Sequence, residues 1–177
     1  MVARLILVVG LGACLFALAQ AHMAIYDPCI MDTRNDKCKG FGKVDYDIAS
    51  PTGQAHQYDD KNGVENLNGG VCRTMPNEKT AVTWAAGSTN TITFANHGSH
   101  KGGFCEWAVS YNEGVTFVVF NTDLNYLKDA KDIEKYSEKL TLPAGLPNGN
   151  ATISWTWVNR EGFREFYWSC FRAQITG

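Results

Sequence analysis

The second half of the chain alternates apolar and polar positions with a period of two. Ile153, Trp155 and Trp157 alternate with smaller hydroxyl residues at 152, 154 and 156. This is the pattern of a β-strand that buries one face. Similar segments occur at 80–84, 90–95, 105–111, 115–121, 139–142, 151–158 and 165–176. The sequence therefore predicts seven strands, with Trp155 and Trp157 in the core.

Turn-forming residues separate these segments. They are Ala-Gly-Ser at 86–88, Asn-Glu-Gly at 112–114, and a stretch rich in Gly, Pro and Asn at 143–150. Seven short strands connected in this way are typical of two antiparallel sheets packed face to face. We therefore expect an all-β fold, an antiparallel β-sandwich of the immunoglobulin or fibronectin type.

Two regions depart from this pattern. Residues 22–73 are dense in Gly, Asp, Asn and Lys and have few periodic apolar runs, so we expect long N-terminal loops with at most a short helical turn. Residues 127–138 are charged and contain neither Gly nor Pro, which favours a helix or a long crossover.

The N-terminus has the three parts of a secretory signal. Arg4 precedes an apolar run at 5–19, and the small-residue sequence Ala19-Gln20-Ala21 follows. Cleavage after Ala21 leaves 156 of the 177 residues, the size of one domain. We expect residues 1–21 to be a signal peptide and residues 22–177 to form a single secreted, extracellular domain.

Charge and cysteine content limit the function classes. The net charge of −2 becomes −3 without Arg4, and no Lys/Arg cluster remains to indicate nucleic acid or a membrane as partner. Five cysteines remain after cleavage, so at least one is unpaired. In an oxidising compartment we expect bridges Cys29–Cys38 and Cys72–Cys170, with Cys105 as a buried spare thiol.

Cleavage after Ala21 makes His22 the first residue of the secreted protein. An N-terminal histidine offers a metal two nitrogens, the free α-amine and an imidazole nitrogen. A second histidine, His97 or His100, would complete a three-nitrogen set that suits copper and leaves positions open for oxygen species. His56, in a Gly- and Asp-rich loop, is a surface residue or substrate contact in this interpretation.

Three stretches resemble the lytic polysaccharide monooxygenases, closest to the fungal chitin-active type. They are His-Lys-Gly-Gly-Phe-Cys-Glu at 100–106, Ser-Tyr-Asn-Glu-Gly-Val-Thr-Phe at 110–117, and the run from Trp-Thr-Trp at 155–157 through Asn159 and Arg160 to Cys170. The resemblance covers the N-terminus and about residues 80–175, whereas the loops at 27–70 match nothing in that family.

The resemblance implies a copper enzyme with one Cu ion. His22 and His100 would be its nitrogen ligands, Tyr167 would occupy the axial position, and Glu165 would act beside the metal. The Gly-Gly and Cys105 spacing favours His100 over His97 as the internal ligand. His97 would then form a hydrogen bond nearby.

The resemblance also implies a function. Such an enzyme is a monooxygenase that breaks glycosidic bonds with an external electron donor and O2 or H2O2. We expect a monomer acting on chitin or cellulose, with pectin as a further candidate. Two alternatives stay open, a non-catalytic copper-binding protein and a carbohydrate-binding or wall module. Asn150-Ala-Thr is an N-glycosylation sequon.

Overall fold

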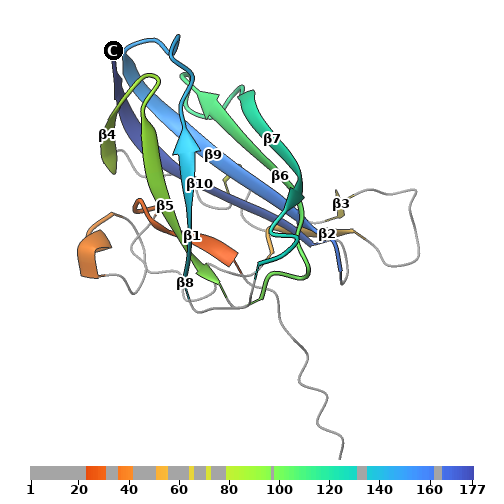
Figure 1. Ribbon diagram of the computed structural model, residues 1–177. Coiled ribbons are helices and arrows are strands. Elements are labelled where there is room, and N and C mark those ends of the chain that lie inside the picture. The colour runs from red at the N-terminus through yellow and green to blue at the C-terminus, as the bar shows by residue number, and fades with distance from the viewer. Residues whose placement is uncertain are drawn as a thin grey trace, which may run out of the picture.

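The computed structural model describes residues 23–30, 36–41, 51–55, 64–65, 71–72, 79–96, 98–130, 135–161 and 165–177. These residues form a β-sandwich (Figure 1), as the sequence predicts. Its elements are β1 (Met23–Asp27), the 3-10 turn η1 (Asp36–Cys38), β2 (Gly53–Ala55), β3 (Val64–Glu65), β4 (Val82–Ala85), β5 (Thr89–Asn96), β6 (Gly103–Ser110), β7 (Val118–Tyr126), β8 (Lys135–Thr141), β9 (Gly149–Asn159) and β10 (Glu165–Thr176).

The strands form a small sheet and a large one. The small sheet has the order β1-β5-β8, and the large sheet has the order β3-β2-β10-β9-β6-β7, with β4 added beside β10. The described pairs are antiparallel except for β4, which runs parallel to β10 with Val82 opposite Ala173. The predicted antiparallel sandwich is confirmed, with this one parallel pair in addition.

Aromatic side chains fill the space between the two sheets. Trp155 and Trp157 of β9 are fully buried, which confirms their prediction as core residues. Phe94 of β5 packs against Trp155 across the interface, with 4.9 Å between the ring centroids. Because large rings from both sheets interlock here, this contact holds the two layers in a fixed relation.

Of the two alternatives expected at 127–138, a helix or a long crossover, the helix is wrong for the described part of that segment, which leads from β7 of the large sheet to β8 of the small one. Leu127 adopts a left-handed backbone with a φ of 57° and starts a turn in which the Ala130 amide donates to the Leu127 carbonyl. From Lys135 onward the chain is strand β8, paired with β5. Tyr136, Glu138 and Leu140 are less exposed than the residues between them. This alternation with a period of two is the signal of a strand, and it outweighs the lack of Gly and Pro that favoured a helix.

The N-terminal region contains strands that the sequence analysis assigned to loops. Met23, Ala24 and Ile25 of β1 are buried, and β1 pairs with β5. Strands β2 and β3 extend the large sheet beyond β10. Conversely, residues 115–117 belong to a loop, and β7 begins at Val118. The short helical turn is present as η1, and no helix among the described residues is long and apolar enough to cross a bilayer.

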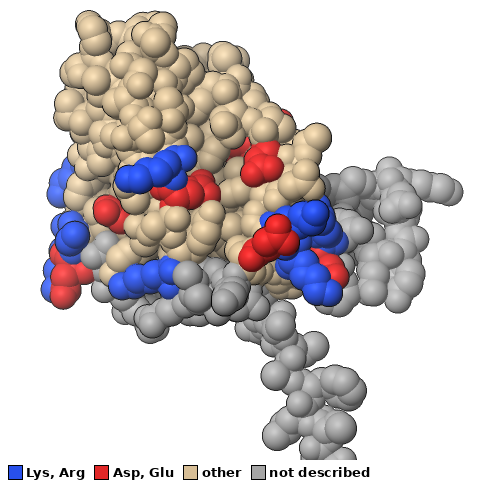
Figure 2. All heavy atoms as spheres, viewed as in Figure 1, with Lys and Arg blue, Asp and Glu red and all other residues tan. Residues whose placement is uncertain are grey.

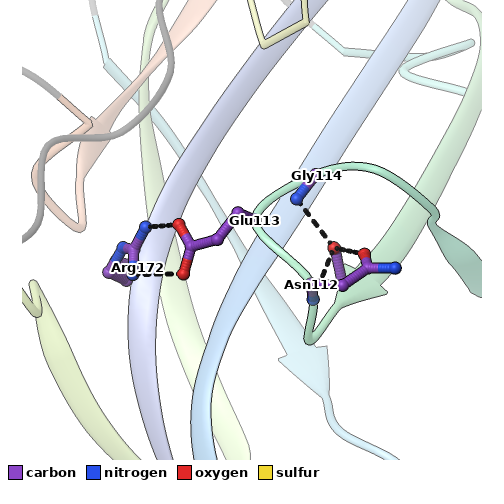
Figure 3. Close-up of polar contacts among 5 residues, drawn as sticks. Asn112, Glu113, Gly114 and Arg172 are labelled. Carbon is purple, nitrogen blue, oxygen red and sulfur yellow. Dashed lines mark hydrogen bonds and ion pairs between the residues drawn. The ribbon is translucent and has the colours of Figure 1, made fainter.

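Polar contacts fix the loop between β6 and β7. The Ser110 hydroxyl accepts a hydrogen bond from the Gly114 amide (2.9 Å) and donates one to Asn112 Oδ1 (2.9 Å), and Asn112 Oδ1 also accepts from the Thr116 amide (3.0 Å). The Glu113 carboxylate forms a two-point ion pair with Arg172 of β10 (Figure 3). The Ser-Tyr-Asn-Glu-Gly motif is therefore a scaffold for this loop.

The cysteine prediction is confirmed in full. Cys29–Cys38 ties the segment after β1 to η1, and Cys72–Cys170 ties an early loop to β10. Cys105 is free and only 1% exposed. Burial strongly raises the pKa of its thiol, with the nearby carboxylates of Glu138 and Asp123 acting in the same direction. The thiol is thus kept neutral and unreactive in the folded protein.

Candidate metal centre

The loop that joins β5 to β6 carries His100 and is tied to the loop that follows β9. The Glu161 amide donates to the His100 carbonyl (3.2 Å) and the Arg160 amide donates to the Gly102 carbonyl (2.7 Å). An ion pair between Lys101 and Glu161 (2.9 Å) crosses the same junction at the surface. A segment far away in the sequence, residues 160–161, therefore fixes the backbone of the loop that carries His100.

The imidazole of His100 has one nitrogen in use and one without a partner. Its Nδ1 is hydrogen-bonded to the Glu161 carbonyl. Because a carbonyl only accepts, this contact places the ring proton on Nδ1 and leaves the lone pair on Nε2. Nε2 is shielded from solvent and has no hydrogen-bond partner among the described residues. A buried, unpartnered imidazole nitrogen with a fixed tautomer is the arrangement expected of a metal ligand.

Two glycines after His100 let backbones pass at close range. A Cβ at Gly102 would lie 2.2 Å from the Tyr126 carbonyl oxygen, and one at Gly103 would lie 2.0 Å from the Val158 carbonyl oxygen. Gly102 also has a φ of 90°, in the left-handed region. The Gly-Gly pair of the motif is therefore required by space, and it sets the position of the histidine loop against β9.

A network of three side chains lies at the same end of the sandwich. The Tyr167 hydroxyl donates to Glu165 Oε2 (2.8 Å), and the Asn159 amide donates to the same oxygen (2.6 Å). Asn159 Oδ1 also accepts the Glu165 backbone amide (3.0 Å). Asn159 is buried and therefore holds both the carboxylate and the backbone amide of Glu165 in place. Glu165 and Tyr167 share a face of β10, as their spacing predicts.

Tyr167 is packed as tightly as a core residue. It is 1% exposed and stacks on Trp157, with ring centroids 4.8 Å apart and planes inclined by 28°. Burial is the main reason that the pKa of its hydroxyl is raised far above the ordinary value, and the Glu165 carboxylate adds to the effect. Phe166 and Trp168 lie on the opposite face and are more exposed, which confirms the predicted alternation.

The sequence comparisons identify the family. No family model matches the sequence. The chain is 30% identical over 169 residues to an AA11 family lytic polysaccharide monooxygenase A from Aspergillus fumigatus, an alignment that covers 96% of this chain and 71% of the relative. An AA11 lytic polysaccharide monooxygenase from Aspergillus oryzae is 28% identical over 108 residues, which is 54% of this chain and 26% of the relative.

This chain belongs to the AA11 family of lytic polysaccharide monooxygenases. It is accordingly an enzyme of a copper-dependent class whose members act on polysaccharides. Among solved structures, a lytic polysaccharide monooxygenase from Kitasatospora papulosa matches with a TM-score of 0.42 and 13% identity, over 55% of this chain and 51% of the other. At that TM-score the likeness supports no further statement.

The structure describes part of the copper site predicted from the sequence. His100, Glu165 and Tyr167 are described, whereas His22, His97 and His56 lie outside the described residues. Within the described part of the chain, no group of three or more His, Cys, Asp or Glu side chains gathers at metal-binding distances. Neither Asn159 nor the Glu161 carbonyl was among the predicted site residues. Asn159 could have been found, because it lies inside the quoted motif. The Glu161 carbonyl could not, because every residue type carries a backbone carbonyl.

Proposed function

We propose that this AA11 chain is a secreted, copper-dependent monooxygenase that oxidatively cleaves the glycosidic bonds of chitin, with cellulose and then pectin as the next substrates to test. The observation that carries the proposal is the buried Nε2 of His100, which has no hydrogen-bond partner in the described part of the chain while Nδ1 is held by the Glu161 carbonyl. Chitin comes first because the quoted motifs resemble those of the fungal chitin-active enzymes.

The proposed copper ligands are the α-amine and imidazole of His22, Nε2 of His100 and, axially, Tyr167. The strand register supports this set. Met23, which directly follows His22, pairs with Asn96 at the end of β5, and the loop carrying His100 starts after β5. In an antiparallel pair the start of one strand lies beside the end of the other. The proposal therefore requires only short connections between the two histidines.

Copper bound there would supply the one-electron redox chemistry that oxidative cleavage of a glycosidic bond needs, with an external electron donor and O2 or H2O2 as co-substrate. The residues of this chain would control the surroundings. Both described hydrogen bonds to the Glu165 carboxylate fall on Oε2, so Oε1 is left to orient the oxygen co-substrate or to take up a proton. By holding Oε2, Asn159 fixes the direction in which Oε1 points.

We further propose that residues 1–21 are removed during secretion, that residues 22–177 act as one domain, and that the enzyme is a monomer. The two disulfides support an oxidising destination. Asn150 of the sequon is exposed near the start of β9, so its side chain is accessible to modification. Glycosylation at this site is part of the proposal.

The decisive experiment compares three forms of the secreted protein: one that begins at His22, one with an additional N-terminal residue, and His100→Gln. Each is titrated with Cu(II) and followed by electron paramagnetic resonance and calorimetry. Each is then incubated with a reductant and chitin, cellulose or pectin, and oxidised oligosaccharides are detected by mass spectrometry. Lys101→Gln is the matched control because it alters an exposed neighbour of His100.

We expect tight Cu(II) binding and oxidised products from the first form and from Lys101→Gln only. Either change to the histidines removes nitrogen ligands, and copper affinity should fall by at least about 100-fold. Tight copper binding without products from any polymer would favour the non-catalytic copper protein. Polymer binding that is indifferent to copper would favour the carbohydrate-binding module, and either result would refute the proposal.

A further inference from the structure

A cavity lies at the open edge of the sandwich, between β8 of the small sheet and β6 and β7 of the large one. Its volume is about 290 Å³, close to the lower limit of typical small-ligand sites. Buried Cys105, Trp107, Tyr126 and Leu140 form its inner end, and more exposed residues of β7 and β8 form its rim. On the face seen in Figure 2, acidic side chains lie in the region of β7 and β8, next to basic ones.

The polar groups around this cavity gather at the Glu138 carboxylate. Tyr126 is 95% buried, and its hydroxyl, one of the donors that favour the ionised form of Glu138, makes no hydrogen bond of ordinary length within the described residues. The Glu138 carboxylate stands near the hydroxyls of Tyr126 and Tyr136 and the indole N–H of Trp107, all of which influence its ionisation. A buried hydroxyl without a partner costs about 1–3 kcal/mol, so native proteins rarely retain one unless something else satisfies it. The arrangement leaves room for an additional polar group.

The cavity is acidic and its acids have no cationic partner within the described residues. Neither Glu138 nor Asp123 forms an ion pair there, although the Asn125 amide donates to one oxygen of Asp123 (2.8 Å). The ammonium of Lys139, next to Glu138 in sequence, donates instead to the Thr91 hydroxyl of β5 (2.7 Å). An anionic ligand is therefore disfavoured, and a positive one is favoured.

The walls of the cavity distinguish between kinds of cation. Three aromatic side chains, Trp107, Tyr126 and Tyr136, line it. Aromatic rings attract organic ammonium groups through their negative faces, and several rings with a nearby carboxylate form the usual cage for such groups. A divalent metal ion would need several close anionic ligands, and the described part of the chain contains no such group of three.

We propose that this cavity binds a small organic ammonium ion, with the aromatic rings of Trp107, Tyr126 and Tyr136 around it and the carboxylate of Glu138 as its counter-ion. The Tyr126 hydroxyl accepts a hydrogen bond from the ammonium where the ligand carries N–H groups. The ammonium arrives either as a free amine or on an amino sugar. This site is separate from the proposed copper ligands and does not depend on them.

Binding depends on pH through Glu138. Burial raises the pKa of this carboxyl to about 7, the Asp123 charge from β7 adds to the effect, and the donors Tyr126, Trp107 and Tyr136 oppose it. Cys105 of β6 also faces this group and stays neutral, and Lys139 lines the cavity. Since the ionised form is the counter-ion, ammonium binding strengthens as pH rises through about 7.

The test uses matched pairs of probes that differ mainly in charge. Tetramethylammonium is compared with tert-butanol, and glucosamine with glucose, by calorimetry and tryptophan fluorescence on the full secreted protein at pH 5.5 and 8. Calcium chloride is a separate arm. Glu138→Gln keeps the shape and removes the charge, and Tyr136→Leu removes one half-buried ring. Asp36→Asn, in the exposed turn η1, is the acidic control outside the cavity. Thermal unfolding of each variant verifies that it is folded.

We expect a charged probe to bind at pH 8 and its neutral match to bind at least about tenfold more weakly. Glu138→Gln should lose about tenfold in affinity together with the pH dependence, and Asp36→Asn should lose neither. Binding of tetramethylammonium alone would indicate a small ammonium ion that is not carried on a sugar, and binding of glucosamine alone would indicate an amino sugar. Equal binding of charged and neutral probes, binding of calcium alone, or no binding at all would overturn the proposal.

Discussion

The buried carboxyl of Glu138 predicts a specific dependence of stability on pH. Its pKa rises from the ordinary 4.5 to about 7 in the folded protein, mainly because burial disfavours the charged form. The folded state therefore holds this proton over a pH range in which the unfolded chain has released it. Stability from this group is fully present below pH 4.5 and is lost as pH rises through about 7.

The size of the effect follows from the two pKa values. Each factor of ten in the ionisation equilibrium is worth about 1.4 kcal/mol, so the group lowers stability by roughly 3 kcal/mol at pH 8 and by less than about 1 kcal/mol at pH 5. Glu138→Gln carries no ionisable group. We therefore expect this variant to gain stability relative to the parent protein by roughly 2 kcal/mol between pH 5 and pH 8.

The assay is urea unfolding of the metal-free protein, followed by tryptophan fluorescence at half-unit pH intervals from 5 to 8. The difference between parent and variant removes the contribution of every other titrating group. Glu113→Gln is the control of opposite sign, because the Arg172 guanidinium lowers the pKa of the Glu113 carboxyl. A difference between parent and Glu138→Gln that is constant with pH, or that grows in favour of the parent at pH 8, would refute the reasoning.

Three further outcomes follow from the packing. Gly103→Ala should lower the free energy of unfolding by at least about 3 kcal/mol through the clash of its Cβ with a carbonyl oxygen, whereas Gly145→Ala, with nothing within 4 Å, should change it by less than about 0.5 kcal/mol in the same denaturation assay. Cys105 should fail to react with a thiol reagent in the native protein and release one equivalent of product after denaturation, and prompt native labelling would contradict its burial. Asn159→Ala should lower the free energy of unfolding, measured by calorimetry, by about 2–4 kcal/mol, because two hydrogen bonds to Glu165 are lost. A loss below about 1 kcal/mol would mean that solvent replaces these bonds.

The strands that could be predicted are those whose two faces meet different surroundings. In β10, Tyr167 faces the core and its neighbours Phe166 and Trp168 do not, so the sequence alternates and the strand is recognisable. Strand β1 is apolar at three consecutive buried positions and gives no alternation. It therefore looked like part of a loop. A buried edge of a small sheet is set by its partner β5, and that partner is not encoded in the five residues themselves.

The candidate site shows the same division between what residue identity records and what the backbone supplies. His100, Glu165 and Tyr167 could be proposed from motifs because a motif records the identity of side chains. What makes His100 suitable as a ligand is a carbonyl of Glu161 that fixes its tautomer, and any residue at 161 offers that carbonyl. The glycines at 102 and 103 are the only trace of this arrangement in the sequence, since their missing side chains let the histidine loop approach β9. Replacement of Glu161 by Gln should therefore leave copper binding nearly unchanged, whereas Gly103→Ala should weaken it, although neither residue is a proposed ligand.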